Sequence, residues 1–168
     1  MYAHSIVCCY LHPITKYGYP PPAENTIDYL EEMHDLGFQS VELEGIRENH
    51  LKGVYENRAE ILNKMKELEI NVPYFCVVLP GLAAGYKKER EKNLKLFQMG
   101  CEMAHFIGSK GVLDNAPLPP YQFPNDIPVT RHYDEKALSQ ACLPPNLNWK
   151  KYWNAMVHTF QDACDIAA

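Results

Sequence analysis

Short apolar runs and longer amphipathic stretches alternate along this chain, and few folds accommodate that order. The predicted strands are Ser5–Tyr10, Ser40–Gly45, Val72–Leu79 and Lys110–Asp114. The predicted helices run from about Asn25 to Leu36, from about Asn57 to Leu68, from near Lys87 to Gly108, and from near Trp149 onward. Strands that alternate with helices in this way indicate parallel pairing with right-handed crossovers.

Two architectures have this order: a doubly wound sheet and a (β/α)8 TIM barrel. A doubly wound nucleotide-binding fold usually has a glycine-rich first turn, and the segment after the first strand, Leu11–Thr15, has none. A complete barrel needs about 250 residues, whereas this chain has 168. We therefore predict an α/β fold with about four βα units, with residues 1–168 as the N-terminal half of a TIM-barrel domain.

One segment breaks the alternation. Residues 116–148 contain seven prolines and little periodicity, so we predict a proline-rich loop insertion there. Four βα units alone would leave unpaired strand edges, which soluble proteins avoid. We expect that the chain is part of a longer one or is completed by another half, either a homo-oligomeric copy or a partner subunit.

Composition excludes several classes of function. The net charge of −5 is scattered, which argues against nucleic-acid binding. Apolar runs stay well short of the roughly 20 residues of a membrane span. The six cysteines form no CxxC pair, and most lie in apolar patterns, which favours a reducing, cytoplasmic location.

Acidic residues on the second predicted strand are the strongest candidates for a binding site. Glu42 and Glu44 share one face of that strand, while Val41 and Leu43 take the other, because side chains alternate. Two carboxylates on a buried face are costly unless they are paired or bind something. Either Glu42 pairs with a structural Arg or Lys and Glu44 is solvated, or Glu44 contacts substrate with Glu42 supporting it.

Other candidates also fall at the carboxyl ends of strands, where parallel βα folds gather their functional groups. Asp114 ends the fourth strand and could bind sugar hydroxyls or cap the following turn. Tyr10 and His12 lie at the end of the first strand, although a His before Pro is also common as an ordinary surface residue. Cys76, on the third strand, is interpreted as core because the sequence shows no base beside it.

Three segments resemble a known superfamily. Leu36-Gly37-Phe38-Gln39-Ser40-Val41-Glu42-Leu43 is similar to the second-strand motif of the xylose-isomerase-like superfamily, which includes sugar phosphate isomerases and epimerases. Residues 68–73 and 103–112 resemble that superfamily's entries to its third and fourth strands.

The resemblance implies a metal-dependent sugar isomerase or epimerase that moves a proton next to a carbonyl. It also implies a divalent metal (Mn, Mg, Co or Zn) and a small carbohydrate substrate. The family's metal ligands lie on strands of the second half, so we assign no metal ligand in this chain and expect the ligands beyond residue 168. Alternatives are a lyase relative that cleaves C-glycosides with a partner subunit and a non-catalytic half-barrel. Relatives that repair DNA, similar to endonuclease IV, have a His where Asp114 stands, which disfavours that function.

Overall fold

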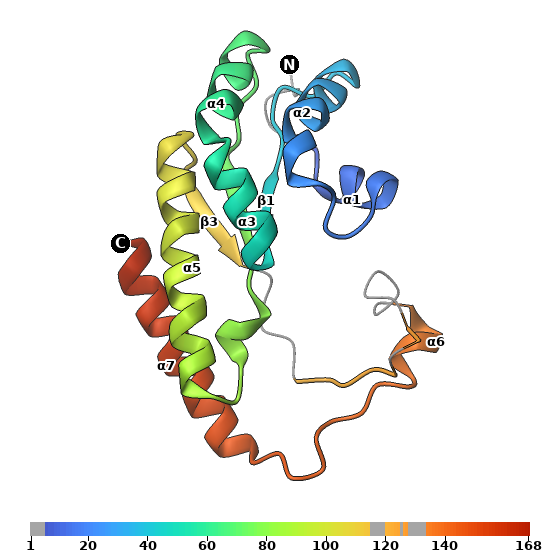
Figure 1. The fold of residues 1–168 in the computed structure, drawn as a ribbon, viewed down its shortest axis with the longest axis vertical. Coiled ribbons are helices and arrows are strands. Elements are labelled where there is room, and N and C mark those ends of the chain that lie inside the picture. The colour runs from blue at the N-terminus through green and yellow to red at the C-terminus, as the bar shows by residue number, and fades with distance from the viewer. Residues whose placement is uncertain (1–5, 115–119, 125, 128–133) are drawn as a thin grey trace.

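Three parallel strands form the sheet at the centre of the molecule. The computed structural model describes residues 6–114, 120–124, 126–127 and 134–168. The strands are β1 (Leu43–Ile46), β2 (Tyr74–Val78) and β3 (Gly111–Asp114), and they lie side by side in chain order (Figure 1). Both pairings are parallel. This confirms the predicted order of strands and the parallel α/β class.

In the first predicted strand, Ser5–Tyr10, Ser5 lies outside the described residues, and residues 6–10 form a single parallel bridge, between Cys8 and Val41. The Cys8 amide donates to Ser40 at 2.9 Å, and the Glu42 amide donates to Cys8 at 2.8 Å. Ile6 and Val7 before it are exposed. Soon after Cys8 the chain enters a helix that begins at Leu11, so it pairs with the segment before β1 at one residue pair.

Helices connect the strands, and two of them differ from the prediction. The helices after the first turn are α2 (Thr26–Asp35), α3 (Arg47–Glu56), α4 (Arg58–Glu67) and α5 (Lys87–Phe106). The helix α3 was not predicted, because only three of its residues are buried and its apolar pattern is weak. The helix α1 (Leu11–Tyr17) replaces a predicted loop; its Pro13 lies in the first turn, where no amide hydrogen is needed.

The sheet packs its apolar face against α3 and α5. A side chain at Gly100 of α5 would meet Val77 of β2 at 2.5 Å, so the absence of one lets the helix approach the strand. On β1, Gly45 likewise faces Leu51 of α3 and the Phe75 ring. Because Phe75 and Val77 face the helices, Cys76 between them points to the opposite face. That opposite face carries the candidate site.

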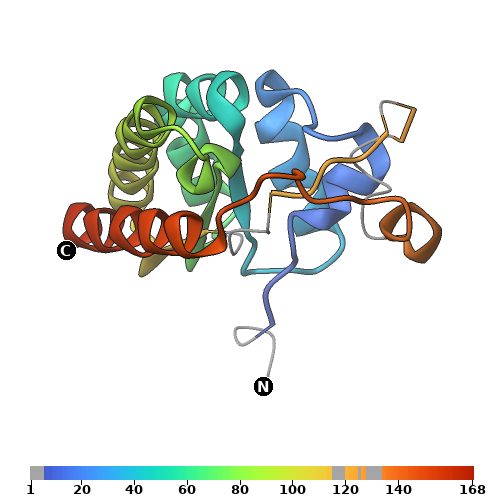
Figure 2. The same cartoon turned by 90° about the horizontal axis from the view of Figure 1, so that it is seen from below.

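The described residues 134–148 lead to the last helix, α7 (Trp149–Ala167) (Figure 1). Residues 115–119, 125 and 128–133 of the predicted insertion lie outside the described residues. The described part contains the short helix α6 (Glu135–Leu138) and an antiparallel bridge between Gln122 and Cys142. Helix α7 packs along α5, and α1 lies on the other side of the molecule (Figure 2). Within the described residues, every helix is too short or too polar to cross a membrane.

Candidate functional site

Glu42, Glu44 and Cys76 come together on the face of the sheet that the helices do not cover. Glu44 of β1 is directly opposite Cys76 of β2 in the parallel register. Glu42 lies two residues before Glu44 and therefore on the same face. One donor atom from each of the three side chains lies within 4.8 Å of the other two. The predicted pairing of the two carboxylates on one face is thus realised, and a thiol joins them.

Glu44 is buried without a partner. Its side chain is 6% exposed, and among the described residues it makes no hydrogen bond or ion pair. Burial is the main reason that the pKa of Glu44 rises to about 7, and the charge of Glu42 adds to it. Glu44 is therefore not the solvated rim residue of the first alternative, and its carboxyl group titrates near neutral pH.

Glu42 is held in place by the segment that precedes α1. Its Oε2 atom accepts a hydrogen bond from the Tyr10 amide at 3.1 Å and another from the Cys9 thiol at 3.0 Å. Together with burial, the bond to Glu42 raises the pKa of Cys9 to about 11. In the described part of the chain, no Arg or Lys pairs with Glu42. The structural ion pair considered as one alternative is therefore replaced by bonds to the backbone and a thiol.

Asp114 lies at the carboxyl end of β3, where it is in register with Val77, so alternation places it on the other face of the sheet from Glu44 and Cys76. Burial raises its pKa to about 7, while a hydrogen bond to the backbone at Leu79 acts in the opposite direction. The negative charges of Glu44, Glu42 and Asp114 all add to burial in raising the pKa of the Cys76 thiol. Asp114 therefore binds the loop after β2 and also contributes to a strongly negative environment around Cys76.

Tyr10 is fully buried beside the carboxylates. Its hydroxyl comes near Thr26, but no described residue makes a hydrogen bond of ordinary geometry with it. Burial and the neighbouring Tyr29 and Glu44 raise the pKa of Tyr10. Its ring lies edge-on to His50, with 6.3 Å between ring centroids. Tyr10 thus contributes both its amide and its ring to the surroundings of the site.

His50 of α3 is a second buried polar residue that sequence reasoning missed. Its Nδ1 atom accepts a hydrogen bond from the Ile46 amide at 3.1 Å, so the ring proton is on Nε2. The Nε2 atom is buried and has no partner in the described residues. Burial lowers the pKa of His50 to about 4, and the ring is therefore neutral. It fixes the end of β1 against the start of α3.

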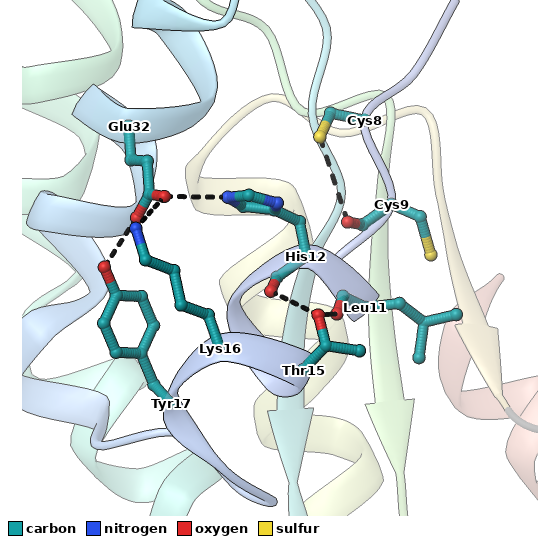
Figure 3. Close-up of polar contacts among 8 residues, drawn as sticks. All are labelled: Cys8, Cys9, Leu11, His12, Thr15, Lys16, Tyr17 and Glu32. Atoms are coloured by element: carbon teal, nitrogen blue, oxygen red, sulfur yellow. Dashed lines mark hydrogen bonds and ion pairs between the residues drawn. The ribbon is translucent and has the colours of Figure 1, made fainter.

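His12 is not part of the carboxylate group. Figure 3 shows its ring turned toward Glu32 of α2, where its Nε2 atom lies 3.0 Å from a carboxylate oxygen. Lys16 and Tyr17 of α1 converge on the same carboxylate. These bonds lower the pKa of Glu32 to about 2, with the Lys16 contact contributing most. In this position His12 helps to hold α1 against α2.

Strand alternation predicted that Glu42 and Glu44 share a face, which the structure confirms, but it did not place Cys76 or Cys9 beside them. Cys76 is 2% exposed, as expected of a core residue, yet it faces the carboxylates. Alternation along the third strand could have placed it opposite Phe75 and Val77, but only the register with β1 brings it beside Glu44. The bond from Cys9 to Glu42 depends on how the chain enters α1, which no local pattern specifies.

Comparison with known proteins gives a relationship in fold and none in sequence. No protein-family model matches the chain. No curated protein matches it. A D-psicose 3-epimerase from Clostridium cellulolyticum H10, solved with D-tagatose, aligns with a TM-score of 0.56 at 11% identity, over 85% of this chain and 43% of the epimerase. A D-psicose 3-epimerase solved in the presence of D-fructose aligns with a TM-score of 0.59 at 12% identity, over 96% of this chain and 49% of its own.

The chain therefore spans less than half the length of these solved structures. At such low identity the likeness concerns the fold, and it agrees with the parallel sheet and the order of elements described above. By its structure, this chain has the fold of part of a TIM barrel, similar to the corresponding part of these two epimerases.

Proposed function

We propose that the chain forms half of a metal-dependent sugar isomerase or epimerase that moves a proton at the carbon next to a carbonyl. One observation carries the proposal. Glu44 is a buried carboxyl group on the face of the parallel sheet that the helices do not cover, and burial brings its pKa to about 7. A group that titrates near the working pH can both take and return a proton, as general acid–base catalysis requires.

The neighbouring residues have supporting roles in this proposal. Glu42, fixed by the Tyr10 amide, lies beside Glu44 and adds to the effect of burial in raising the pKa of Glu44. Asp114 would accept hydrogen bonds from sugar hydroxyls at the edge of the site. His12 is left out, because its ring is bonded to Glu32 of α2 and not to the carboxylates of the site.

The resemblance and the fold both favour a divalent metal, for which we propose Mn, Mg, Co or Zn. Bound beside the substrate, such a metal would polarise the carbonyl oxygen. We propose that its ligands come from strands outside these 168 residues, supplied by further chain, a second copy or a partner subunit. All six cysteines are free thiols, which fits a reducing compartment such as the cytoplasm.

Exchange of substrate hydrogen with solvent tests this function directly. The protein together with the strands that supply the metal ligands would be incubated with Mn²⁺ and a panel of ketoses and aldoses in D2O, and deuterium at the carbon next to the carbonyl would be followed by NMR. We expect incorporation into at least one sugar, and a loss of on the order of 100-fold or more in Glu44→Gln, because the proton carrier is removed.

Glu67→Gln is the matched control, since Glu67 is an exposed residue at the end of α4. It should exchange at the unmodified rate. If no sugar in the panel gains deuterium, or if Glu44→Gln exchanges as fast as Glu67→Gln, the proposed function is wrong.

A further inference from the structure

The group of Glu42, Glu44 and Cys76 can itself hold a metal ion. Its three donor atoms lie within 4.8 Å of one another, close enough for a single cation to contact all three. Two donors are carboxylate oxygens and one is a thiol sulfur. Glu44 and Cys76 come from neighbouring strands at the same level of the sheet, so the backbone fixes their separation.

Burial without compensation is the second observation that points to a ligand. Glu44 is only 6% exposed, and it accepts no hydrogen bond from any described residue. The ion pairs of the described residues include neither Glu42 nor Glu44. A buried carboxylate normally pairs with a cation or binds a metal. Here the unpartnered carboxylate points at another carboxylate and a thiol.

Glu42 is oriented as metal ligands usually are. Both of its bonds, from the Tyr10 amide and from the Cys9 thiol, go to Oε2, which leaves Oε1 without a hydrogen bond from the described residues. Partners outside the coordination sphere that orient a ligand in this way commonly strengthen metal binding. The geometry fixes one carboxylate oxygen and leaves the other available.

We propose that Glu42, Glu44 and Cys76 form a binding site for a thiophilic divalent cation, Zn²⁺ or Co²⁺. The donor set selects the class of metal. A cysteine sulfur favours Zn²⁺ and related ions, whereas Mg²⁺ and Ca²⁺ prefer oxygen ligands throughout. Three protein ligands leave a fourth tetrahedral position open for water or another ligand. This site lies wholly within the chain, and the metal of the proposed function has its ligands elsewhere. Because Glu44 is also the proton carrier of that function, a cation bound here would block the proton transfer.

Binding of a metal here displaces protons. The Cys76 thiol must lose its proton to coordinate through sulfur, and Glu44 must be ionised. Both protons pass to the solvent or buffer, and the cation replaces them as the source of positive charge. The affinity for Zn²⁺ should therefore increase as the pH is raised.

Titration of the chain with Co²⁺ tests the site without any activity assay. The protein would carry Cys142→Ser and Cys164→Ser, which remove two exposed thiols far along the chain. After chelator treatment, we expect saturable binding of one Co²⁺ with a thiolate-to-cobalt charge-transfer absorption in the near ultraviolet. Excess Zn²⁺ should abolish this absorption by displacing the cobalt.

Two further substitutions assign the ligands. Cys76→Ser should remove the charge-transfer absorption, and Glu44→Gln should weaken binding at least about tenfold while leaving the thiol in place. In parallel, Zn²⁺ should raise the melting temperature of the unmodified chain but not that of Glu44→Gln. Circular dichroism confirms that each variant is folded, and Glu44→Gln decides the question if Cys76→Ser does not fold.

The proposal is overturned if Co²⁺ does not bind saturably, or if its charge-transfer absorption persists in folded Cys76→Ser. It is also overturned if Glu44→Gln binds Co²⁺ as tightly as the unmodified chain. These results do not depend on any sugar, so they are distinct from failure of the proposed epimerase activity.

Discussion

The free energy of unfolding should reveal the buried charge of Glu44 directly. Its pKa is about 7 in the folded chain and 4.5 for an ordinary glutamate, which is the value expected on unfolding. Below about pH 4.5 the Glu44 carboxyl group is protonated in both the folded and the unfolded chain, so its ionisation does not change the free energy of unfolding. Between the two values the unfolded chain loses its proton first, so stability falls as the pH rises. Above about pH 7 the full destabilisation is present.

The size of this effect follows from the two pKa values. Each pH unit between them corresponds to about 1.4 kcal/mol, so ionised Glu44 should destabilise the fold by roughly 3 kcal/mol at about pH 8. Glu44→Gln keeps the shape of the side chain and removes the charge. In chelator we expect this variant to be roughly 2 to 3 kcal/mol more stable at about pH 8 and equally stable at about pH 4.5. For a chain of this size, that difference raises the melting temperature by about 5 to 10 °C.

Urea unfolding followed by circular dichroism, repeated at several pH values, measures this difference. Glu67→Gln is again the control, because it removes an exposed carboxyl group and should not change the pH dependence. A Glu44→Gln variant that is less stable at about pH 8, or whose stability differs from the unmodified chain by the same amount at every pH, would refute the reasoning.

Three other predictions concern packing, the outer ion network and thiol reactivity. Gly100→Ala should destabilise the fold by about 1 to 3 kcal/mol, because the added methyl group would lie 2.5 Å from Val77 of β2. Gly85→Ala is the control, since no atom lies within 4 Å of the methyl group that it adds. Equal melting temperatures of the two variants would contradict this prediction. In an NMR titration the Glu32 carboxyl should ionise with a pKa of about 2, and a midpoint at the ordinary value would mean that its bonds to α1 do not form in solution. Iodoacetamide should modify Cys9 at least about ten times more slowly than Cys142, because burial and the bond to the Glu42 carboxylate raise the pKa of Cys9 to about 11. Similar rates for the two thiols would argue against that bond.

The strands were the most predictable part of this fold. Apolar runs bounded by glycine and proline placed β1, β2 and β3, and the alternation with helices predicted their parallel order. Two helices could not be predicted in this way. The helix α1 contains Pro13, which sequence reasoning takes as a loop residue, and α3 presents too few apolar side chains for a clear period. In both, contact with the rest of the fold stabilises what the local sequence leaves undecided.

The sequence predicted which face of the sheet carries Glu42 and Glu44, but it did not predict which residues contact them. Strand parity put Glu42 and Glu44 on one face, because that depends only on alternation. The group with Cys76 depends on the register between β1 and β2, which is set by the packing of whole strands. The partners of Glu42 depend on the first strand ending after one rung, so that the Tyr10 amide is free to turn toward the carboxylate. His12 was predicted as a site residue, but its ring contacts Glu32 instead. Glu32 is 20 residues away in the sequence, so no local pattern indicates this contact.

The bond from the Tyr10 amide to Glu42 gives this chain an internal reporter. That amide hydrogen links the start of α1 directly to a carboxylate of the site. Its exchange with deuterated solvent should therefore follow the state of Glu42, being slow while the carboxylate accepts the bond and fast if the carboxylate moves away. A single backbone resonance can thus report whether a ligand displaces Glu42 on the face of the sheet that the helices do not cover.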